Sequence, residues 1–339
     1  MSPEPSPAAP PAAPAGASMP LVVGVDLGGT KILGRLLDPS DPRRERVVVR
    51  VDTPRGAAAI VEAIAEVVRR VDGLGRGEGF GPVAAVGVGA AGLIDLGGVL
   101  RFAPNLPTVV DLDLAGELTR LLDLPVVVDN DANCATLAEH QLGAATGARD
   151  AVLVTLGTGI GAGVIVDGVV QRGSAGFAGE PGHMVVDPNG PPCPCGRRGC
   201  WERFASGSGL GRLGRDAAAA GRADRVVALA GGDEEAVRGE HVTMAALEGD
   251  PGALEVLRSF AWWVALGIGN LVSVLDPEVV VIGGGLVAAG DALLGPTREA
   301  YAELVLANEH RPPVRIVPAQ LGNDAGSIGA GLLARTLVP

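Results

Sequence analysis

The sequence predicts an α/β protein built from two similar halves. Short apolar runs that end in Gly or Asp alternate with stretches that repeat apolar residues at helical spacing. Two of the apolar runs, 22–31 (VVGVDLGGTK) and 152–161 (VLVTLGTGIG), each turn into a Gly/Thr-rich bend before a second apolar segment. We interpret this similarity as a weak internal repeat, in which two halves face a cleft and each presents one phosphate-contacting turn.

The individual elements follow from length and periodicity. Apolar runs this short suit buried strands, whereas apolar residues at helical spacing suit amphipathic helices. Asp250 before Pro251 is typical of an N-cap followed by proline at the first helical position, and it opens a long helix towards Leu275. The predicted strands are 22–27, 32–38, 83–88, 125–128, 152–156 and 279–282, and the predicted helices are 56–71, 111–122, 134–140 and 251–275.

Length and composition set the domain organisation and exclude several classes of protein. The chain has 339 residues and a formal net charge of −12, which disfavours a nucleic-acid partner. The apolar stretch 260–275 is short and interrupted by polar residues, so we expect no membrane span, and we expect a cytoplasmic protein. We expect a disordered Pro/Ala-rich tail at 1–20, a small domain at 21–130, a large domain at 131–326, and a last helix at 327–339 that rejoins the small domain.

Three glycine-rich bends are candidate nucleotide contacts. Glycines without Cβ let backbone N–H groups approach phosphate oxygens, and Asp26 beside the first bend can reach a phosphate-bound Mg²⁺. A single bend of this kind is more often a hairpin turn that binds nothing, so the argument rests on their recurrence. The candidates are Gly28, Gly29 and Thr30, then Gly157, Thr158 and Gly159, and finally Gly283, Gly284 and Gly285, where a side chain would block a flat adenine ring.

The run Asp129-Asn130-Asp131-Ala132-Asn133 supplies the candidate base. It follows an apolar strand, and open α/β sheets bind ligands at the carboxyl ends of their strands. An alternative is that Asp131 only caps the helix that follows it.

One His and three Cys form a candidate metal site. His183, Cys193, Cys195 and Cys200 are spaced H-x9-C-x-C-x4-C, and three thiolates with one imidazole complete a tetrahedral zinc set. Because protein fills all four positions, such a zinc would shape a loop and would not activate water. The alternative is a disulfide or unligated cysteines, although disulfides belong mainly to oxidising compartments.

Several motifs together resemble those of the ROK family, most closely its bacterial glucokinases. They are DLGGTK, APNLP, DNDAN, LGTGIGAGVIVDG, GEPGH, CPCGRRGCWE and LDPEVVVIGGG, and the resemblance covers the chain from Leu21 to the end. It implies the actin-like, RNase H-like duplicated fold, with two domains around a cleft. It also implies ATP-dependent phosphorylation of glucose to glucose 6-phosphate with Mg²⁺ and a structural Zn²⁺, in a homodimer or homotetramer.

The resemblance also implies residue roles. The aspartate matching Asp131 takes the proton from the sugar 6-hydroxyl, and the residues matching the His/Cys set hold the zinc. Carboxylates and amides suit a polyol because each can fix two hydroxyl groups. The residues matching sugar-binding positions are Asn105, Asn130, Asp131, Glu180, His183 and Glu202.

Three other functions remain open within this reading. A kinase for another hexose or for an N-acetylhexosamine would share the hydroxyl-binding residues. A polyphosphate-dependent glucokinase would require a basic groove, which the acidic balance disfavours, although Arg197 and Arg198 keep it open. A non-catalytic sugar sensor would bind sugar without turnover. A ROK repressor is disfavoured, because a Pro/Ala-rich tail cannot form the DNA-binding helix-turn-helix.

Overall fold

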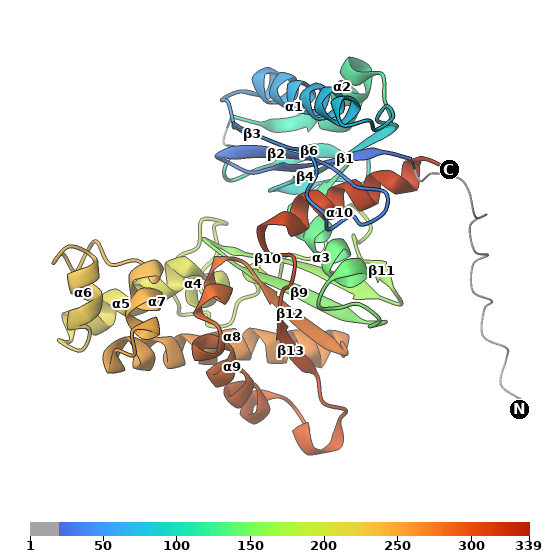
Figure 1. Cartoon of the computed structure of the whole chain (residues 1–339). Coiled ribbons are helices and arrows are strands. Elements are labelled where there is room, and N and C mark those ends of the chain that lie inside the picture. The colour runs from blue at the N-terminus through green and yellow to red at the C-terminus, as the bar shows by residue number, and fades with distance from the viewer. Residues whose placement is uncertain (1–19, 107) are drawn as a thin grey trace, which may run out of the picture.

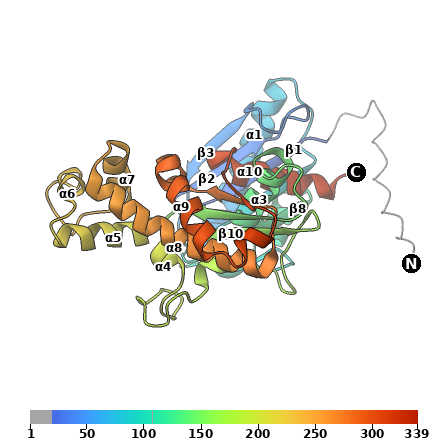
Figure 2. The ribbon, with the colours of Figure 1, turned by 90° about the horizontal axis from the view of Figure 1, so that it is seen from below.

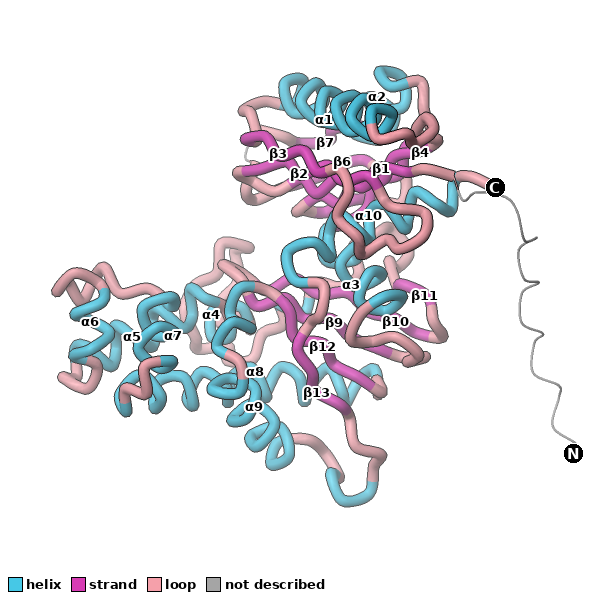
Figure 3. The backbone as a smooth tube through the Cα atoms, in the orientation of Figure 1, coloured by secondary structure: helices cyan, strands magenta, loops and turns pink. Residues whose placement is uncertain are grey.

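The computed structural model describes residues 20–106 and 108–339 as two α/β lobes (Figure 1). One sheet is built from strands between residues 22 and 130, and the other from strands between residues 151 and 318. Figure 3 shows the two sheets as separate layers, with helices between them and on their outer faces. The tail predicted to be disordered (1–20) lies outside the described residues up to residue 19. Pro107 of the APNLP motif also lies outside them.

The first sheet places the N-terminal strand at its centre. Its strands are β1 (Val22–Leu27), β2 (Lys31–Leu36), β3 (Val48–Asp52), β4 (Ala85–Ala90) and β8 (Val126–Asn130), in the order β3-β2-β1-β4-β8. β1 pairs antiparallel with β2 and parallel with β4. Because both faces of β1 and β4 are covered, nearly every residue in them is buried, which explains their continuous apolar sequence.

Two helices cover the outer face of this sheet. The helix α1 (Ala57–Gly77) packs on β2 and β3, and α2 (Leu114–Leu122) packs on α1 and β8 (Figure 1). Along α1 the buried residues Ile60, Ile64, Val67 and Val71 recur every three or four positions, so they form one apolar face. This periodicity is the signal that predicted the helix.

A small antiparallel sheet corrects one predicted boundary. Its strands are β5 (Leu93–Ile94), β6 (Val99–Phe102) and β7 (Val110–Asp113). The helix expected at 111–122 therefore begins only at Leu114. The alternating sequence Val-Asp-Leu-Asp pairs with β6, and the Asp113 side chain then caps α2 by accepting a hydrogen bond from Gly116 N at 3.0 Å.

The second sheet repeats the arrangement of the first. Its strands are β9 (Ala151–Leu156), β10 (Ile160–Val166), β11 (Val169–Val170), β12 (Val279–Gly283) and β13 (Arg315–Pro318), in the order β11-β10-β9-β12-β13. β9 pairs antiparallel with β10 and parallel with β12, as β1 does with β2 and β4. The structure thus confirms the internal repeat predicted from the two glycine-rich bends.

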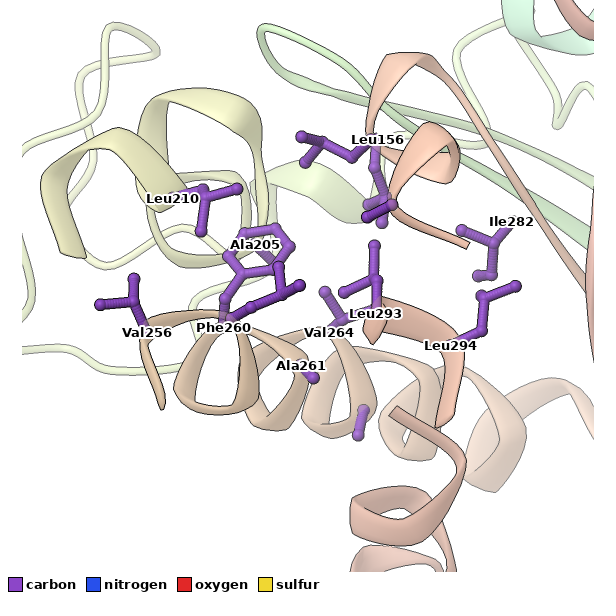
Figure 4. Close-up of a cluster of buried hydrophobic side chains, with 14 of the residues drawn as sticks. Leu156, Ala205, Leu210, Val256, Phe260, Ala261, Val264, Ile282, Leu293 and Leu294 are labelled. Atoms are coloured by element: carbon purple, nitrogen blue, oxygen red, sulfur yellow. The ribbon is translucent and has the colours of Figure 1, made fainter. Parts of the chain in front are cut away.

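The long helix α8 (Pro251–Leu275) and its neighbour α9 (Asp291–Leu304) build the largest core. Asp250 caps α8 as predicted, with its side chain accepting a hydrogen bond from Ala253 N at 2.8 Å. Figure 4 shows Phe260 and Val264 of α8 among the side chains of this core, together with Leu293 of α9. By length and composition α8 could cross a membrane, but 61% of its most apolar window is buried inside the protein.

A group of short helices projects beyond the second sheet. Figure 2 shows α5, α6 and α7 extending to one side at the end of α8. These helices were not predicted, because the sequence there is rich in Gly and Ala. The short helices are α4 (Glu202–Ala205), α5 (Gly207–Ala219), α6 (Asp224–Leu229) and α7 (Gly239–Leu247), with 3-10 turns at Pro181–His183, Gly285–Ala289, Asn308–His310, Gly322–Asp324 and Arg335–Leu337.

Two helices, α3 (Asp131–Leu142) and α10 (Ala325–Ala334), lie between the sheets (Figures 1 and 3). The C-terminal α10 packs on β1, β4 and α3, so the last segment of the chain joins the first sheet. The contact brings backbone against backbone, since a Cβ on Gly24 would lie 1.9 Å from Ser327 O and one on Gly329 would lie 1.7 Å from Cys134 O. Glycine is therefore required at Gly24 for α10 to pack on β1, and at Gly329 for α10 to pack against α3.

Candidate functional site

The two predicted glycine bends lie at the carboxyl ends of the central strands. In the first, Gly28 N donates to Lys31 O at 3.0 Å and the Thr53 hydroxyl donates to Gly28 O at 2.8 Å, closing a tight hairpin between β1 and β2. A Cβ on Gly29 would lie 2.7 Å from the Cβ of Asn105. The first bend and a predicted sugar-binding residue are therefore neighbours, although Gly29 and Asn105 are 76 positions apart in the sequence.

Asp26 and Asp131 are brought together at the base of this region. Asp26 is largely buried, and burial, followed by the charge of Asp131, raises its pKa from 3.8 to about 7. Burial likewise raises the pKa of Asp131. The Asp26 carboxyl carbon would lie 3.3 Å from a Cβ on Gly326, so it faces the start of α10. Two buried carboxyl groups with raised pKa values, one of them raised partly by the charge of the other, favour a cation or a transferred proton at this place.

The helix cap beside Asp131 is Asn130, not Asp131. The Asn130 side-chain oxygen accepts hydrogen bonds from Ala132 N at 2.8 Å and Asn133 N at 3.1 Å, and its amide donates to Gly92 O at 3.1 Å. Asp131 Oδ1 accepts from Ala132 N at 2.9 Å, and among the described residues no other residue donates to its Oδ2. Asp131 is thus held at the N-terminus of α3 without being needed as the cap.

Two glutamates and His183 form the opposite side of the site. Partial desolvation of its carboxyl group by the surrounding protein, followed by the charges of Asp131 and Glu202, raises the pKa of Glu180 to about 7. Glu202 Oε1 lies 3.9 Å from His183 Nδ1, and its Oε2 would lie 2.7 Å from a Cβ on Gly159. Glu202 therefore lies over the second glycine bend and links it to the predicted sugar-binding residues.

The second and third glycine bends are also adjacent. Gly157 N donates to Gly159 O at 3.0 Å, and Gly207 N donates to Gly157 O at 2.7 Å. Gly284 has φ +84°, and a Cβ there would lie 2.5 Å from Leu156 O. Glycine is thus required where the bend after β12 crosses the end of β9. That adenine lies against Gly283, Gly284 and Gly285 stays a prediction.

The four predicted metal ligands converge. The ligand atoms of His183, Cys193, Cys195 and Cys200 all lie within 4.8 Å of one another. Cys195 and Cys200 Sγ are 3.5 Å apart, and Cys193 Sγ is 3.8 Å from His183 Nδ1. Ligands on a tetrahedral zinc are separated by about 3.8 Å for two sulfurs and about 3.6 Å for sulfur and nitrogen. The set therefore fits Zn²⁺, with His183 Nε2 left on the opposite side of the ring.

Two contacts that organise this region were not predicted from the sequence. Arg172 Nε donates to Asp129 Oδ2 at 2.7 Å, and Asn133 Nδ2 donates to Asp129 Oδ1 at 3.0 Å. Asn133 lies only four positions after Asp129, across the junction of β8 and α3, and this short separation could have suggested the contact. No signal in the sequence pairs Arg172 with Asp129, because they are 43 positions apart.

Comparison with known proteins gives consistent results across sequence and structure. The model of the ROK family matches residues 22–337. A glucokinase of Streptomyces coelicolor is 39% identical over 94% of this chain and 98% of its own length, and one of Thermotoga maritima is 35% identical over 93% and 97%. The crystal structure of a ROK family glucokinase from Streptomyces griseus in complex with glucose and AMPPNP superposes with a TM-score of 0.80 at 39% identity, covering 93% of this chain and 99% of that one.

Proposed function

This chain belongs to the ROK family of actin-like fold, and on that premise we propose that it is a glucokinase that transfers a phosphoryl group from ATP to the 6-hydroxyl of glucose. The observation that carries the proposal is the convergence of Asp26, Asp131, Glu180 and Glu202 between two glycine bends. The identity to glucokinases over nearly the full length supports glucose as the sugar.

Asp131 is the proposed general base. Phosphoryl transfer requires mainly positioning, neutralisation of charge, and a group that orients the attacking hydroxyl and accepts its proton. Among the described residues, no other residue donates a hydrogen bond to Asp131 Oδ2. Burial raises the pKa of Asp131, which makes its carboxylate a stronger base. It can therefore accept the proton of the sugar 6-hydroxyl as the new O–P bond forms.

The glycine bends and Asp26 are proposed to receive the nucleotide. Backbone N–H groups at Gly29–Thr30 and Thr158–Gly159 can donate to phosphate oxygens where no Cβ intervenes. Mg²⁺, when bound to the phosphates, supplies charge neutralisation, and Asp26 is the residue placed to hold it directly or through water. Ionisation of Asp26 beside Asp131 would then be favoured by the cation.

The remaining polar side chains are proposed to bind the sugar. Glu180, Glu202, Asn105 and Asn130 present carboxylate and amide groups that suit vicinal hydroxyls, and a missing hydroxyl would leave them unpaired. Zn²⁺, when bound, would fix the loop around His183 through Nδ1 and leave Nε2 free to reach the sugar. We place no chemical step on this zinc, because four protein ligands close its coordination.

The test is ADP release with Mg-ATP against glucose, mannose, fructose, N-acetylglucosamine and N-acetylmannosamine, with polyphosphate as an alternative donor. We expect preference for glucose with ATP. Preference for another sugar or donor would contradict the assignment of substrate, and absence of turnover in zinc-replete protein would indicate a sugar sensor.

The base is tested with Asp131→Asn, which should abolish turnover while glucose binding remains measurable by calorimetry. Asp123→Asn is the matched control, because it makes the same change at the exposed C-cap of α2, where a left-handed residue (φ 53°) tolerates Asn. Normal turnover of the Asp131 variant would refute its role as base.

A further inference from the structure

We propose that Arg172 is a positioning residue for sugar binding. With Asp129 it forms a clamp that holds the loop 171–180, which leads into Glu180, against the strand end that precedes Asp131. This inference rests on the proposed function, because Glu180 is one of the proposed sugar ligands.

The centre of the clamp is the Asp129 carboxylate, which is 5% exposed. Its Oδ2 accepts a hydrogen bond from Arg172 Nε at 2.7 Å, and its Oδ1 accepts from Asn130 N at 2.7 Å and from Asn133 Nδ2 at 3.0 Å. One buried charge thus connects the end of β8, the first turn of α3 and the loop after β11. A buried carboxylate held by three donors, one of them cationic, fixes the geometry of all of them.

Between Arg172 and Glu180 the loop contacts both lobes. Ala178 N donates to Arg172 O at 3.1 Å, which closes the loop on the residue that anchors it. Midway, a Cβ on Gly176 would lie 2.5 Å from Ile94 O of β5, and one on Gly179 would lie 3.0 Å from Ala162 O of β10. The loop therefore touches the first lobe and the second sheet before it reaches Glu180.

The same arginine sets the charge of this region. The charge of Asp131 acts on both Asp26 and Glu180, and Asp26, Asp129 and Asp131 all act on Cys134, so these carboxyl groups are neighbours. Among the described residues Arg172 is the only cation that forms an ion pair with any of the four. Exposed loops are stabilised weakly by surface ion pairs, but this pair joins a largely buried carboxylate to a guanidinium that is 29% exposed. We therefore expect the loop, and with it Glu180, to lose its fixed position when Arg172 is removed.

The experiment compares Arg172→Met, Arg172→Lys and the double variant Arg172→Met/Asp129→Asn with the wild-type holoenzyme. Steady-state kinetics give KM and kcat for glucose, calorimetry gives glucose affinity, and urea unfolding gives stability. Arg149→Met is the matched control, since Arg149 pairs with Asp167 on the exposed surface of the same lobe.

We expect Arg172→Met to raise the KM for glucose at least tenfold, with a change in kcat of less than threefold, because Asp131 stays in place. Arg172→Lys should restore part of the affinity, and Arg149→Met should leave KM unchanged. The double variant separates positioning from burial of an unpaired charge. It should regain stability, because Asp129 no longer carries a charge, but it should keep the high KM.

A KM for Arg172→Met within twofold of wild type would overturn the proposal. So would a double variant with wild-type KM, because the defect would then come only from the unpaired charge of Asp129. If the wild-type protein is inactive on glucose but active on another hexose of the panel, the proposed substrate fails, and the same comparison with that hexose still decides the role of Arg172.

Discussion

Replacement of Asp26 by Asn should stabilise the magnesium-free protein, and more so at alkaline than at acidic pH. The pKa of Asp26 is raised from 3.8 to about 7, first by burial and then by the charge of Asp131. A difference of about 3 pKa units corresponds to about 4 kcal/mol at about 1.4 kcal/mol per unit. Asn has nearly the same shape but carries no charge, so it removes the cost of ionising a carboxyl group in this position.

The sign follows from proton linkage. Below pH 3.8 the carboxyl is protonated in both the folded and the unfolded chain, and it contributes no pH dependence. Between pH 3.8 and about 7 the folded chain holds the proton more tightly than the unfolded chain, so wild-type stability falls as the pH rises. Above about pH 7 the loss is complete and constant. The advantage of Asp26→Asn should therefore grow by about 2–3 kcal/mol between pH 5 and pH 8.

The assay is urea unfolding of zinc-replete wild-type and Asp26→Asn protein at pH 5, 6, 7 and 8, in buffer without magnesium or chelator. The exposed Asp123→Asn exchange is the control, because it makes the same chemical change at a surface position. An Asp26→Asn effect that is the same at pH 5 and pH 8, or that is destabilising at pH 8, would refute the reasoning that Asp26 ionises against burial. Turnover of the same variant with Mg-ATP should fall, because the proposed magnesium ligand is lost.

Three further predictions concern the base, the metal and the packing. Since burial raises the pKa of Asp131, kcat/KM should fall as the pH drops through an apparent pKa above 3.8, and an acid limb at or below 3.8 would contradict this environment. Cys195→Ser should lose zinc, with the metal content measured by inductively coupled plasma mass spectrometry, and its affinity for glucose should fall. A fully active zinc-free variant would disprove a structural metal. Gly24→Ala should destabilise the fold by about 3 kcal/mol or more in urea unfolding, because its Cβ would lie 1.9 Å from Ser327 O; an unchanged midpoint would show that α10 does not seat so closely.

Local sequence predicted those parts of the fold whose determinants are local. The strands on either side of the two glycine bends were predictable because buried parallel strands read as continuous apolar runs. Asp250 and Pro251 marked the start of α8 because a cap and a first-turn proline act within one turn of helix. The spacing of one His and three Cys predicted a metal set whose members do converge.

The missed features depend on contacts between distant segments. The sequence predicts helix for 111–113 because its apolar residues fit both periods, and pairing with β6 decides in favour of a strand over Val110–Asp113. The ion pair between Arg172 and Asp129 joins residues that only the fold makes neighbours. The raised pKa of Asp26 arises from burial and from Asp131, which no pattern around Asp26 could indicate. Residue identity thus predicted which polar side chains the fold brings together, whereas the pKa shifts of these side chains depend on the three-dimensional arrangement.

The seat of α10 on the first sheet has a consequence for biosynthesis. The strands of that sheet leave the ribosome early, yet the helix that covers their inner face comes from the last segment of the chain (Figure 1). Until residues 325–334 have been synthesised, Val22 and Ala85 lack the side chains of Ile328 and Leu332 that complete their cluster. The N-terminal half must therefore wait in an incomplete state while the second half is made, and it exposes apolar surface during that time. A nascent chain stalled before residue 325 is accordingly the species of this protein most in need of a chaperone.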